Sequence, residues 1–281
     1  MTNILDNPRV AIPTLTAAEA SSIKVTAWRV IRSEWLKLRT LRSSWLTMAL
    51  AILSVPGIGI AIAWSTANDW PNMRPRQKLH FDPLADPLSG FNLAQLAVGV
   101  LAVMLIAGEY SGGMIRATLA AVPRRLPVLW AKVGVLTTMT LITMVPTAIV
   151  TFFISEHFLA ARHIAVTWST PHVPRIVIGV GLYLTVVAAL AMGIGAIVRN
   201  VAGGIGAFVG IILVLPVIAS ALPQTWGDRI NKWLPSNAGQ ALMSISSDNT
   251  TLSPWRGFIV FAGYAVLALV GASILLRRRD A

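Results

Sequence analysis

The amino-acid sequence predicts an all-α integral membrane protein with six transmembrane helices, cytoplasmic N- and C-termini and an amphipathic N-terminal interface helix. Hydrophobic residues make up 55% of the 281 residues and charged residues only 12%, whereas soluble domains carry about 25% charged residues. The charges are clustered, and uncharged stretches of roughly 20 residues separate the clusters, which is the length that crosses a bilayer as a helix. This composition therefore predicts that lipid surrounds most of the chain.

Six uncharged segments are long enough to span the membrane. They cover residues 45–65, 91–108, 133–154, 176–198, 201–222 and 257–276. Helices are expected because backbone groups in lipid must be hydrogen-bonded within the segment, and the alternating pattern of a barrel strand is absent. Pro56, Pro146 and Pro216 lie inside spans, and each can kink its helix. Little more than Arg199 and Asn200 joins the fourth and fifth spans, so these two must form a tight antiparallel pair.

The distribution of basic residues predicts the orientation of the spans. Of the 23 lysines and arginines, 15 fall in the N-terminal segment, the second connection, Arg199 and the C-terminal tail. The positive-inside rule assigns this richer side to the cytoplasm. This topology also accounts for the net charge of +12, so no nucleic-acid partner is predicted. Residues 1–23 contain no apolar signal-peptide core, and we expect a disordered cytoplasmic leader.

The third outer connection carries its own helical pattern. Trp226, Ile230 and Trp233 recur at helical spacing before Pro235. Tryptophan is enriched at membrane interfaces. We therefore expect outer re-entrant or interfacial helices within residues 223–253.

Residues 24–44 predict a basic amphipathic helix at the cytoplasmic interface. Trp28, Ile31, Trp35 and Leu38 recur every three or four positions, opposite a basic face that includes Arg32 and Lys37. Two interpretations are open: the helix only anchors the first span, or it also provides a docking surface for a cytoplasmic partner. The interface-helix residues singled out for a role are Trp28, Arg32, Glu34, Trp35, Lys37 and Arg39.

The connection after the second span predicts a short cytoplasmic helix over residues 111–122. The pair Gly112 and Gly113 permits a sharp turn out of the membrane, and Ile115 and Leu119 belong to an apolar stripe that ends before Pro123. A short helix outside the membrane is therefore expected in this connection.

Glu109 occupies an unusual position at the inward end of the second span. Negative charge is unfavourable at a helix C-terminus unless a cation is near. We expect Glu109 to pair with Arg116 or with a basic residue of the N-terminal helix. The alternative is that its carboxylate reaches water at the headgroups.

A polar stripe runs along the third span. It consists of Thr137, Thr140, Thr143, Thr147 and Thr151, which are spaced three or four apart and share one face. This face could line a pathway or a helix seam. Alternatively, each hydroxyl donates to a carbonyl of its own helix, as threonine does readily.

Several functional classes are disfavoured by missing residues. The predicted spans contain no Asp, Glu, Lys, Arg or His, although proton-coupled transporters use ionisable residues at membrane depth. The sequence has no G-x-x-x-x-G-K-S/T loop, so nucleotide hydrolysis would have to occur on another chain. No H-E-x-x-H motif or intramembrane aspartate pair indicates an enzyme. We expect no directly bound cofactor, metal or catalytic residue.

Three phrases of the sequence together resemble a known family. They are SEWLKLRTLRSSW before the first span, GEYSGGMIRATLAAVPRR followed by LWAK after the second, and SILLRRRDA at the C-terminus. From about residue 24 onward, the chain resembles the permease subunits of type-2 ATP-binding-cassette (ABC) transporters. The second phrase is the most specific element of the resemblance.

The resemblance implies a dimer of permeases, or a pair with a related permease, in a bacterial plasma membrane. It implies two separate cytoplasmic ATPase subunits that hold ATP and Mg, with residues 24–44 as the interface helix and residues 111–122 as the coupling helix. Residues implied in coupling are Glu109, Tyr110, Gly112, Ile115, Arg116, Thr118, Leu119, Arg124 and Arg125. Export of a drug, antibiotic, peptide or lipid is expected. The alternative is a non-transporting sensor or immunity protein that anchors a cytoplasmic partner.

Overall fold

The computed structural model describes residues 26–111, 125–245 and 250–278. All regular elements in these ranges are helical, and six helical segments are long and apolar enough to cross a membrane. The predicted fold class, an all-α protein with six spans, is therefore confirmed.

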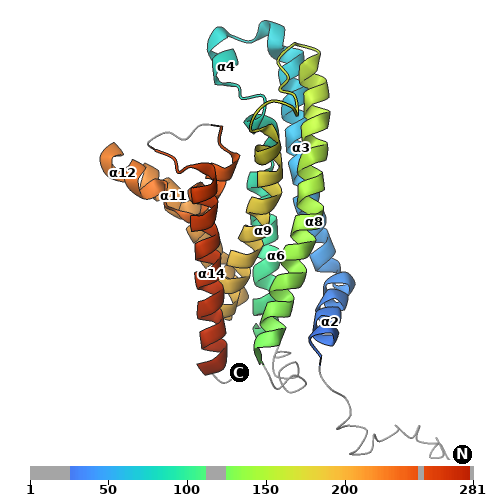
Figure 1. The fold of residues 1–281 in the computed structure, drawn as a ribbon, viewed down its shortest axis with the longest axis vertical. Helices are drawn as coiled ribbons and strands as arrows, with labels where there is room; N and C mark the ends of the chain where they lie inside the picture. The colour runs from blue at the N-terminus through green and yellow to red at the C-terminus, as the bar shows by residue number, and fades with distance from the viewer. Residues whose placement is uncertain (1–25, 112–124, 246–249, 279–281) are drawn as a thin grey trace, which may run out of the picture.

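The six spans and the preceding helix form the long elements of the fold (Figure 1). They are α2 (Ala27–Thr40), α3 (Arg42–Asp69), α6 (Phe91–Ser111), α8 (Arg125–Ala160), α9 (Val173–Val198), α10 (Val201–Val209) continued by η2 (Gly210–Val214) and α11 (Leu215–Ser220), and α14 (Pro254–Arg278). Short helices lie in the connections: η1 (Trp70–Asn72), α4 (Pro75–His80), α5 (Ala85–Leu88), α12 (Gln224–Asn231), α13 (Pro235–Gln240) and η3 (Ala241–Met243).

Several helices extend beyond the uncharged segments that predicted them. Helix α8 has 36 residues and begins at Arg125, so Lys132 lies inside the helix rather than in the preceding connection. A charge marks where lipid contact becomes costly, but it does not end a helix. The N-terminal helix ends earlier than residue 44, because Leu41 is extended (φ −78°, ψ 111°) and separates α2 from α3.

Helix α9 is the centre of the bundle and packs against α6, α8 and α14. Most of its span is buried, whereas the span formed by α10 to α11 is largely exposed. Glycines permit the closest approaches: a Cβ on Gly99 would meet the ring of Phe208 at 2.1 Å, and one on Gly181 would meet the backbone N of Val145 at 2.8 Å. Such small residues let membrane helices pack closely without a hydrophobic driving force.

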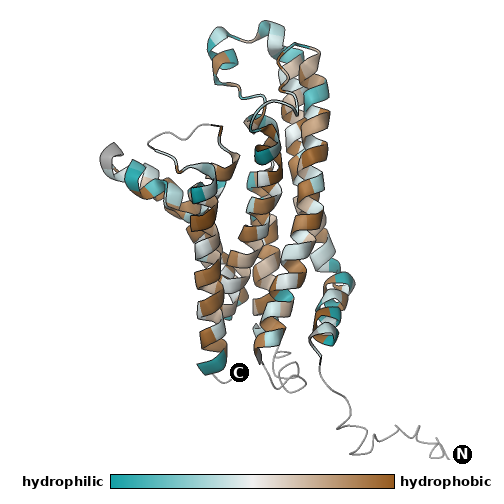
Figure 2. Cartoon of the chain, viewed as in Figure 1, coloured by the Kyte–Doolittle hydropathy of each residue, from teal (hydrophilic) through white to brown (hydrophobic). Residues whose placement is uncertain are grey.

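Polar residues concentrate at the two ends of the bundle (Figure 2). At one end lie α2, the last residues of α6, the first residues of α8 and the C-terminal residues of α14, and we call this the basic end (Figure 1). Arg199, in the left-handed conformation (φ 58°), makes the tight turn from α9 to α10 and donates a hydrogen bond to the carbonyl of Leu275. The fourth and fifth spans are thus closely joined at that end.

Candidate functional site

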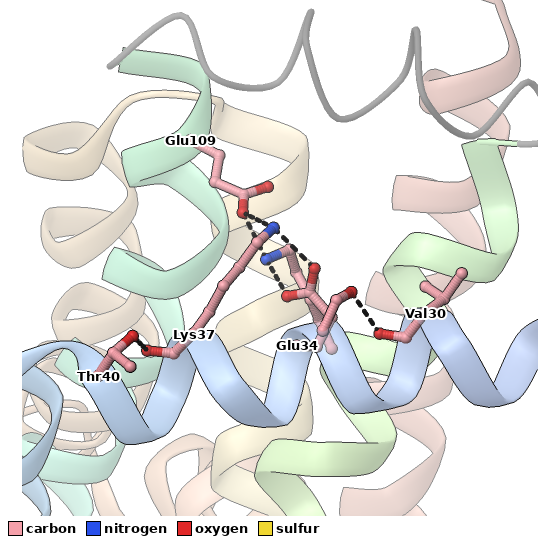
Figure 3. A network of polar contacts seen from close by, with 7 residues as sticks. Val30, Glu34, Lys37, Thr40 and Glu109 are labelled. Atoms are coloured by element: carbon pink, nitrogen blue, oxygen red, sulfur yellow. Dashed lines mark hydrogen bonds and ion pairs between the residues drawn. The ribbon is translucent and has the colours of Figure 1, made fainter. Parts of the chain in front are cut away.

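Four charged side chains from three helices meet at the basic end. They are Glu34 and Lys37 of α2, Glu109 of α6 and Lys132 of α8, and we call them the ion quartet. Lys37 Nζ lies 2.8 Å from Glu34 Oε1 and 3.0 Å from Glu109 Oε1. Lys132 Nζ lies 2.5 Å from Glu34 Oε2 and 2.7 Å from Glu109 Oε1. Each lysine therefore bridges both carboxylates (Figure 3).

Local sequence spacing places these groups together. Glu34 and Lys37 are three residues apart on α2 and so share one face of that helix. Val30, on the same face, packs with Val128 and Ala131 of α8 in a small apolar cluster. This cluster fixes α2 against α8, with Lys132 one residue beyond Ala131.

The ion quartet is electrically neutral and mostly buried. The side chains of Glu34, Glu109 and Lys132 are 4%, 8% and 5% exposed, whereas that of Lys37 is 38% exposed. In such surroundings, removal of one partner leaves an uncompensated charge and costs about 3–5 kcal/mol. Partial burial disfavours the charged form of Lys37, but its hydrogen bonds to Glu34 and Glu109 outweigh this effect and raise the pKa of Lys37.

One oxygen of the ion quartet lacks a donor. Glu109 Oε1 accepts from both lysines, but Glu109 Oε2 is buried and has no hydrogen-bond partner among the described residues. Buried acceptors in proteins are almost always satisfied, and a missing donor costs about 1–3 kcal/mol. This oxygen is therefore a place where a further group would bind favourably.

Glu109 has the cation that its position required. Of the two pairings expected from the sequence, the one with a basic residue of the N-terminal helix is present, through Lys37. The other expected partner, Arg116, lies outside the described residues. Sequence reasoning missed Lys132, which it counted in a connection. The available signal was its place directly after the apolar run of residues 128–131, which continues the apolar pattern of the third span toward the N-terminus.

Helix α2 contacts the bundle through a face that the sequence analysis did not single out. The predicted apolar face combined Trp28, Ile31, Trp35 and Leu38, with Lys37 opposite. In the structure Val30, Glu34 and Leu38 are buried against the bundle, while Trp28 and Trp35 are 71% and 45% exposed. The predicted interfacial face therefore remains largely exposed, and a face that the hydrophobic spacing did not mark contacts the bundle. Arg32 and Arg39 are both exposed.

The other residues that the resemblance implied in coupling have different locations. Tyr110 lies beneath Arg199, whose guanidinium carbon is 5.0 Å from the ring centroid. Arg125 is the first residue of α8. The remainder, together with the predicted coupling helix over 111–122 from residue 112 onward, fall outside the described residues: Gly112, Ile115, Arg116, Thr118, Leu119 and Arg124.

The threonine stripe of α8 bonds within its own helix. Thr137, Thr140, Thr143, Thr147 and Thr151 each donate to the carbonyl four residues earlier, at distances of 2.7–2.9 Å. The stripe faces α3: Thr143 Oγ1 is 4.0 Å from Met48 Sδ, and a Cβ on Gly59 would lie 2.8 Å from Thr151 Cγ2. Of the alternatives left open by the sequence, the geometry favours the helix seam with hydroxyls satisfied locally.

A second polar group lies deep in the bundle, toward the end opposite the ion quartet. Tyr183 of α9 is fully buried and donates to Gln95 Oε1 of α6 at 2.5 Å. This contact ties α9 to α6. The sequence did not predict it, because the two residues are 88 positions apart in the chain.

The geometry defines a class of molecule: a multi-pass membrane protein in which an N-terminal surface helix is joined to two spans by buried ion pairs. Comparison with known families extends this description. The family model described as "ABC-2 family transporter protein" matches residues 30–226, which is more than half of the chain, and the chain belongs to that family. No curated protein matches the chain.

Membership explains the overall organisation. The chain is a membrane-embedded permease component of an ABC transporter, and its family associates with ABC ATPase components. The matched range includes α2 from Val30 onward, the first four spans and α10 to α11. The three elements that build the ion quartet therefore lie almost wholly within the family-defining part of the chain.

Proposed function

We propose that the protein is the permease of an exporter that moves a hydrophobic or amphipathic substrate, such as a drug, antibiotic, peptide or lipid. Two permeases pair in a bacterial plasma membrane with the basic end in the cytoplasm. Two separate ATPase subunits bind at that end and hydrolyse ATP with Mg. Family membership and the excess of basic residues on one side support this proposal.

The ion quartet is the observation that carries the mechanism. It joins α2 to the last turn of α6 and to the first turns of α8. These two spans are the ones that directly precede and follow residues 112–124, which contain most of the predicted coupling helix. A push on that segment, or on the exposed face of α2, would therefore be shared by both spans rather than absorbed by one.

The energetics of the ion quartet suit a rigid connection. Separating any of its buried charges from their partners would leave a charge in low-dielectric surroundings, at a cost of several kcal/mol. Tilting the three helices together preserves every ion pair. Movement of the three helices together therefore costs less free energy than movement of one helix alone. Force from an ATPase would thus move the cytoplasmic halves of α6 and α8 together with α2.

Flux through reconstituted vesicles tests the proposal. The permease and the ATPase encoded beside it would be purified together and placed in proteoliposomes, and ATP-dependent movement of an amphipathic dye would be measured. We expect ATP-dependent flux from the wild type. ATPase binding without any flux of drug, peptide or lipid probes would contradict transport and would support the non-transporting sensor or immunity protein.

Substitutions in the ion quartet test the coupling role. Lys132→Gln should lower transport per ATP hydrolysed at least about tenfold, since it leaves one carboxylate uncompensated. Adding Glu109→Gln restores neutrality and should recover part of the coupling, which a double-mutant cycle would quantify. Lys78→Gln removes a lysine from the connection at the opposite end, where Lys78 lies over the Trp70 ring, and serves as the matched control. Normal coupling in Lys132→Gln would refute the role of the ion quartet.

A further inference from the structure

A cavity of about 400 Å³ lies beside the ion quartet, between α2, α3 and α6. Its wall is mainly apolar and includes Leu38 of α2, Leu101, Met104 and Leu105 of α6, and Met192 of α9. Met104 is 40% exposed, so the cavity communicates with the surface of the bundle. The volume falls within the range of about 300–1,000 Å³ typical of small-molecule sites.

The polar groups of the cavity gather at its basic-end margin. Glu34, Lys37, Glu109 and Lys132 line it there, together with Ser43, Ser44 and Thr47 from the first turns of α3. The cavity therefore has an apolar body and a polar margin at one end. This division matches an amphiphile whose tail lies along α6 and whose head lies at the depth of the ion quartet.

The margin offers complementary groups to a zwitterionic head. Glu109 lines the cavity and is 6% exposed overall, and its buried Oε2 lacks a hydrogen-bond donor among the described residues, so an ammonium N–H group would satisfy this oxygen once the carboxylate turns toward the cavity. The ammonium of Lys37 is partly exposed, and the Ser43 side chain is exposed, so both can contact a phosphate. A carboxylate oxygen that needs a donor, close to a cation, is complementary to a ligand with one amine and one phosphate.

We propose that this cavity binds phosphatidylethanolamine from the membrane leaflet that surrounds the basic end. Its ammonium group donates to Glu109 Oε2, its phosphate contacts Lys37 and Ser43, and one acyl chain occupies the apolar body of the cavity. The bound lipid completes the hydrogen bonding of the ion quartet. Only the assignment to the cytoplasmic leaflet rests on the proposed function, because the chemistry of the cavity is independent of the direction or occurrence of transport.

Lipid headgroups that differ in a single property test this site. The purified, delipidated permease would be titrated in detergent with phosphatidylethanolamine, phosphatidylcholine or phosphatidylglycerol of identical acyl chains, and retention would be measured by native mass spectrometry. Phosphatidylcholine keeps the positive charge but has no N–H donor, and phosphatidylglycerol has no amine. We expect phosphatidylethanolamine to bind at least about tenfold more tightly than either, and to raise the melting temperature by mass action.

A variant that fills the cavity tests its location. Met104→Trp should reduce the preference for phosphatidylethanolamine to less than about twofold without altering any member of the ion quartet. Leu267→Trp introduces the same side chain on α14 at a position that is 70% exposed, and it should keep the wild-type preference. Met104→Phe provides a smaller filling residue should the tryptophan variant fail to fold.

Two outcomes would overturn the proposal. Equal retention of the three lipids by the wild type would eliminate recognition of the amine by Glu109. A full preference for phosphatidylethanolamine in folded Met104→Trp or Met104→Phe would place the lipid elsewhere. These measurements use the permease without its ATPase, so absence of ATP-dependent flux would contradict the proposed function and leave this inference intact.

Discussion

Helix α8 carries two polar regions that satisfy their hydrogen bonds in opposite ways. The hydroxyls of the threonine stripe donate to carbonyls one turn earlier in the same helix. Lys132, by contrast, contacts carboxylates that are 98 and 23 residues away in the sequence. Locally satisfied groups add polarity at little cost and contribute little to joining helices, whereas groups with distant partners connect helices. We therefore expect substitutions in the threonine stripe to be tolerated. Loss of Lys132, by contrast, should affect the whole basic end.

The largest effect is expected from breaking the distant connection. Lys132→Met keeps the length of the side chain but leaves Glu34 and Glu109 with a single cation, Lys37. Unfolding should become easier by about 3–5 kcal/mol. The measurement is the free energy of unfolding by SDS titration in mixed micelles. A loss below about 1 kcal/mol would show that the carboxylates find other partners, and would remove the contrast between the two regions of α8.

Removal of an uncharged hydrogen bond between two helices should have an intermediate effect on stability. Tyr183→Phe removes the hydrogen bond from Tyr183 Oη to Gln95 Oε1, which joins α9 to α6 without any charge. Hydrogen bonds between membrane helices contribute about 0.6 kcal/mol on average and reach about 1.7 kcal/mol. We expect a loss of about 1 kcal/mol in the same titration. A loss of unfolding free energy as large as that of Lys132→Met would indicate that any contact between helices has this effect, whether or not it involves charged groups.

The sequence predicted the local features of the fold better than the distant ones. The uncharged segments located all six spans, because the cost of a charge in lipid acts on each segment separately. Local bonding of the threonines was likewise an open alternative, since it depends only on spacing within α8. The pairing of Glu109 was expected from helix electrostatics, and one of the two proposed partners was correct.

The remaining features depend on how the helices pack. Nothing near Lys132 in the sequence specifies Glu34 as its partner, because their contact arises from the docking of α2 on α8 through Val30. The docking face of α2 has the same origin, since the bundle buries Val30 and Glu34 while Trp28 on the predicted interfacial face stays exposed. The cavity and the unpaired Glu109 Oε2 exist only once α2, α3 and α6 are in place.

Replacing a locally bonded threonine should have a small effect. Thr140→Val removes a hydroxyl that is fully buried and that donates only to the carbonyl of Leu136. That carbonyl keeps its helical hydrogen bond, so the substitution leaves no buried group without a partner. We expect a change of less than about 0.5 kcal/mol in the free energy of unfolding. A loss above about 2 kcal/mol would mean that the seam connects α8 to α3 through the hydroxyl after all.

The smallest effect concerns the dependence of the ion quartet on pH. Hydrogen bonds to Glu34 and Glu109 outweigh partial burial and raise the pKa of Lys37, which is about 10.4 in an unfolded chain. Because the folded state holds this proton more tightly, the contribution of Lys37 to stability is complete below about pH 10.4 and is lost as the pH rises through the higher folded value. Wild type and Lys37→Gln should therefore differ by a constant free energy of unfolding from pH 7 to pH 9.

The pH at which this difference in unfolding free energy begins to change distinguishes the contribution of the Lys37 charge from that of its packing. The difference between wild type and Lys37→Gln should shrink only above about pH 10.4, where Lys37 of the unfolded chain begins to lose its proton. Thr140→Val is the matched control, since a hydroxyl bonded to its own helix should give a difference from wild type that does not change over the same range. A wild-type advantage over Lys37→Gln that grows between pH 7 and pH 9 would require a lowered pKa for Lys37, because the unfolded chain would then bind more protons than the folded one. Burial would then outweigh its two carboxylate partners, and the distant connection at the basic end would be weaker than its geometry indicates.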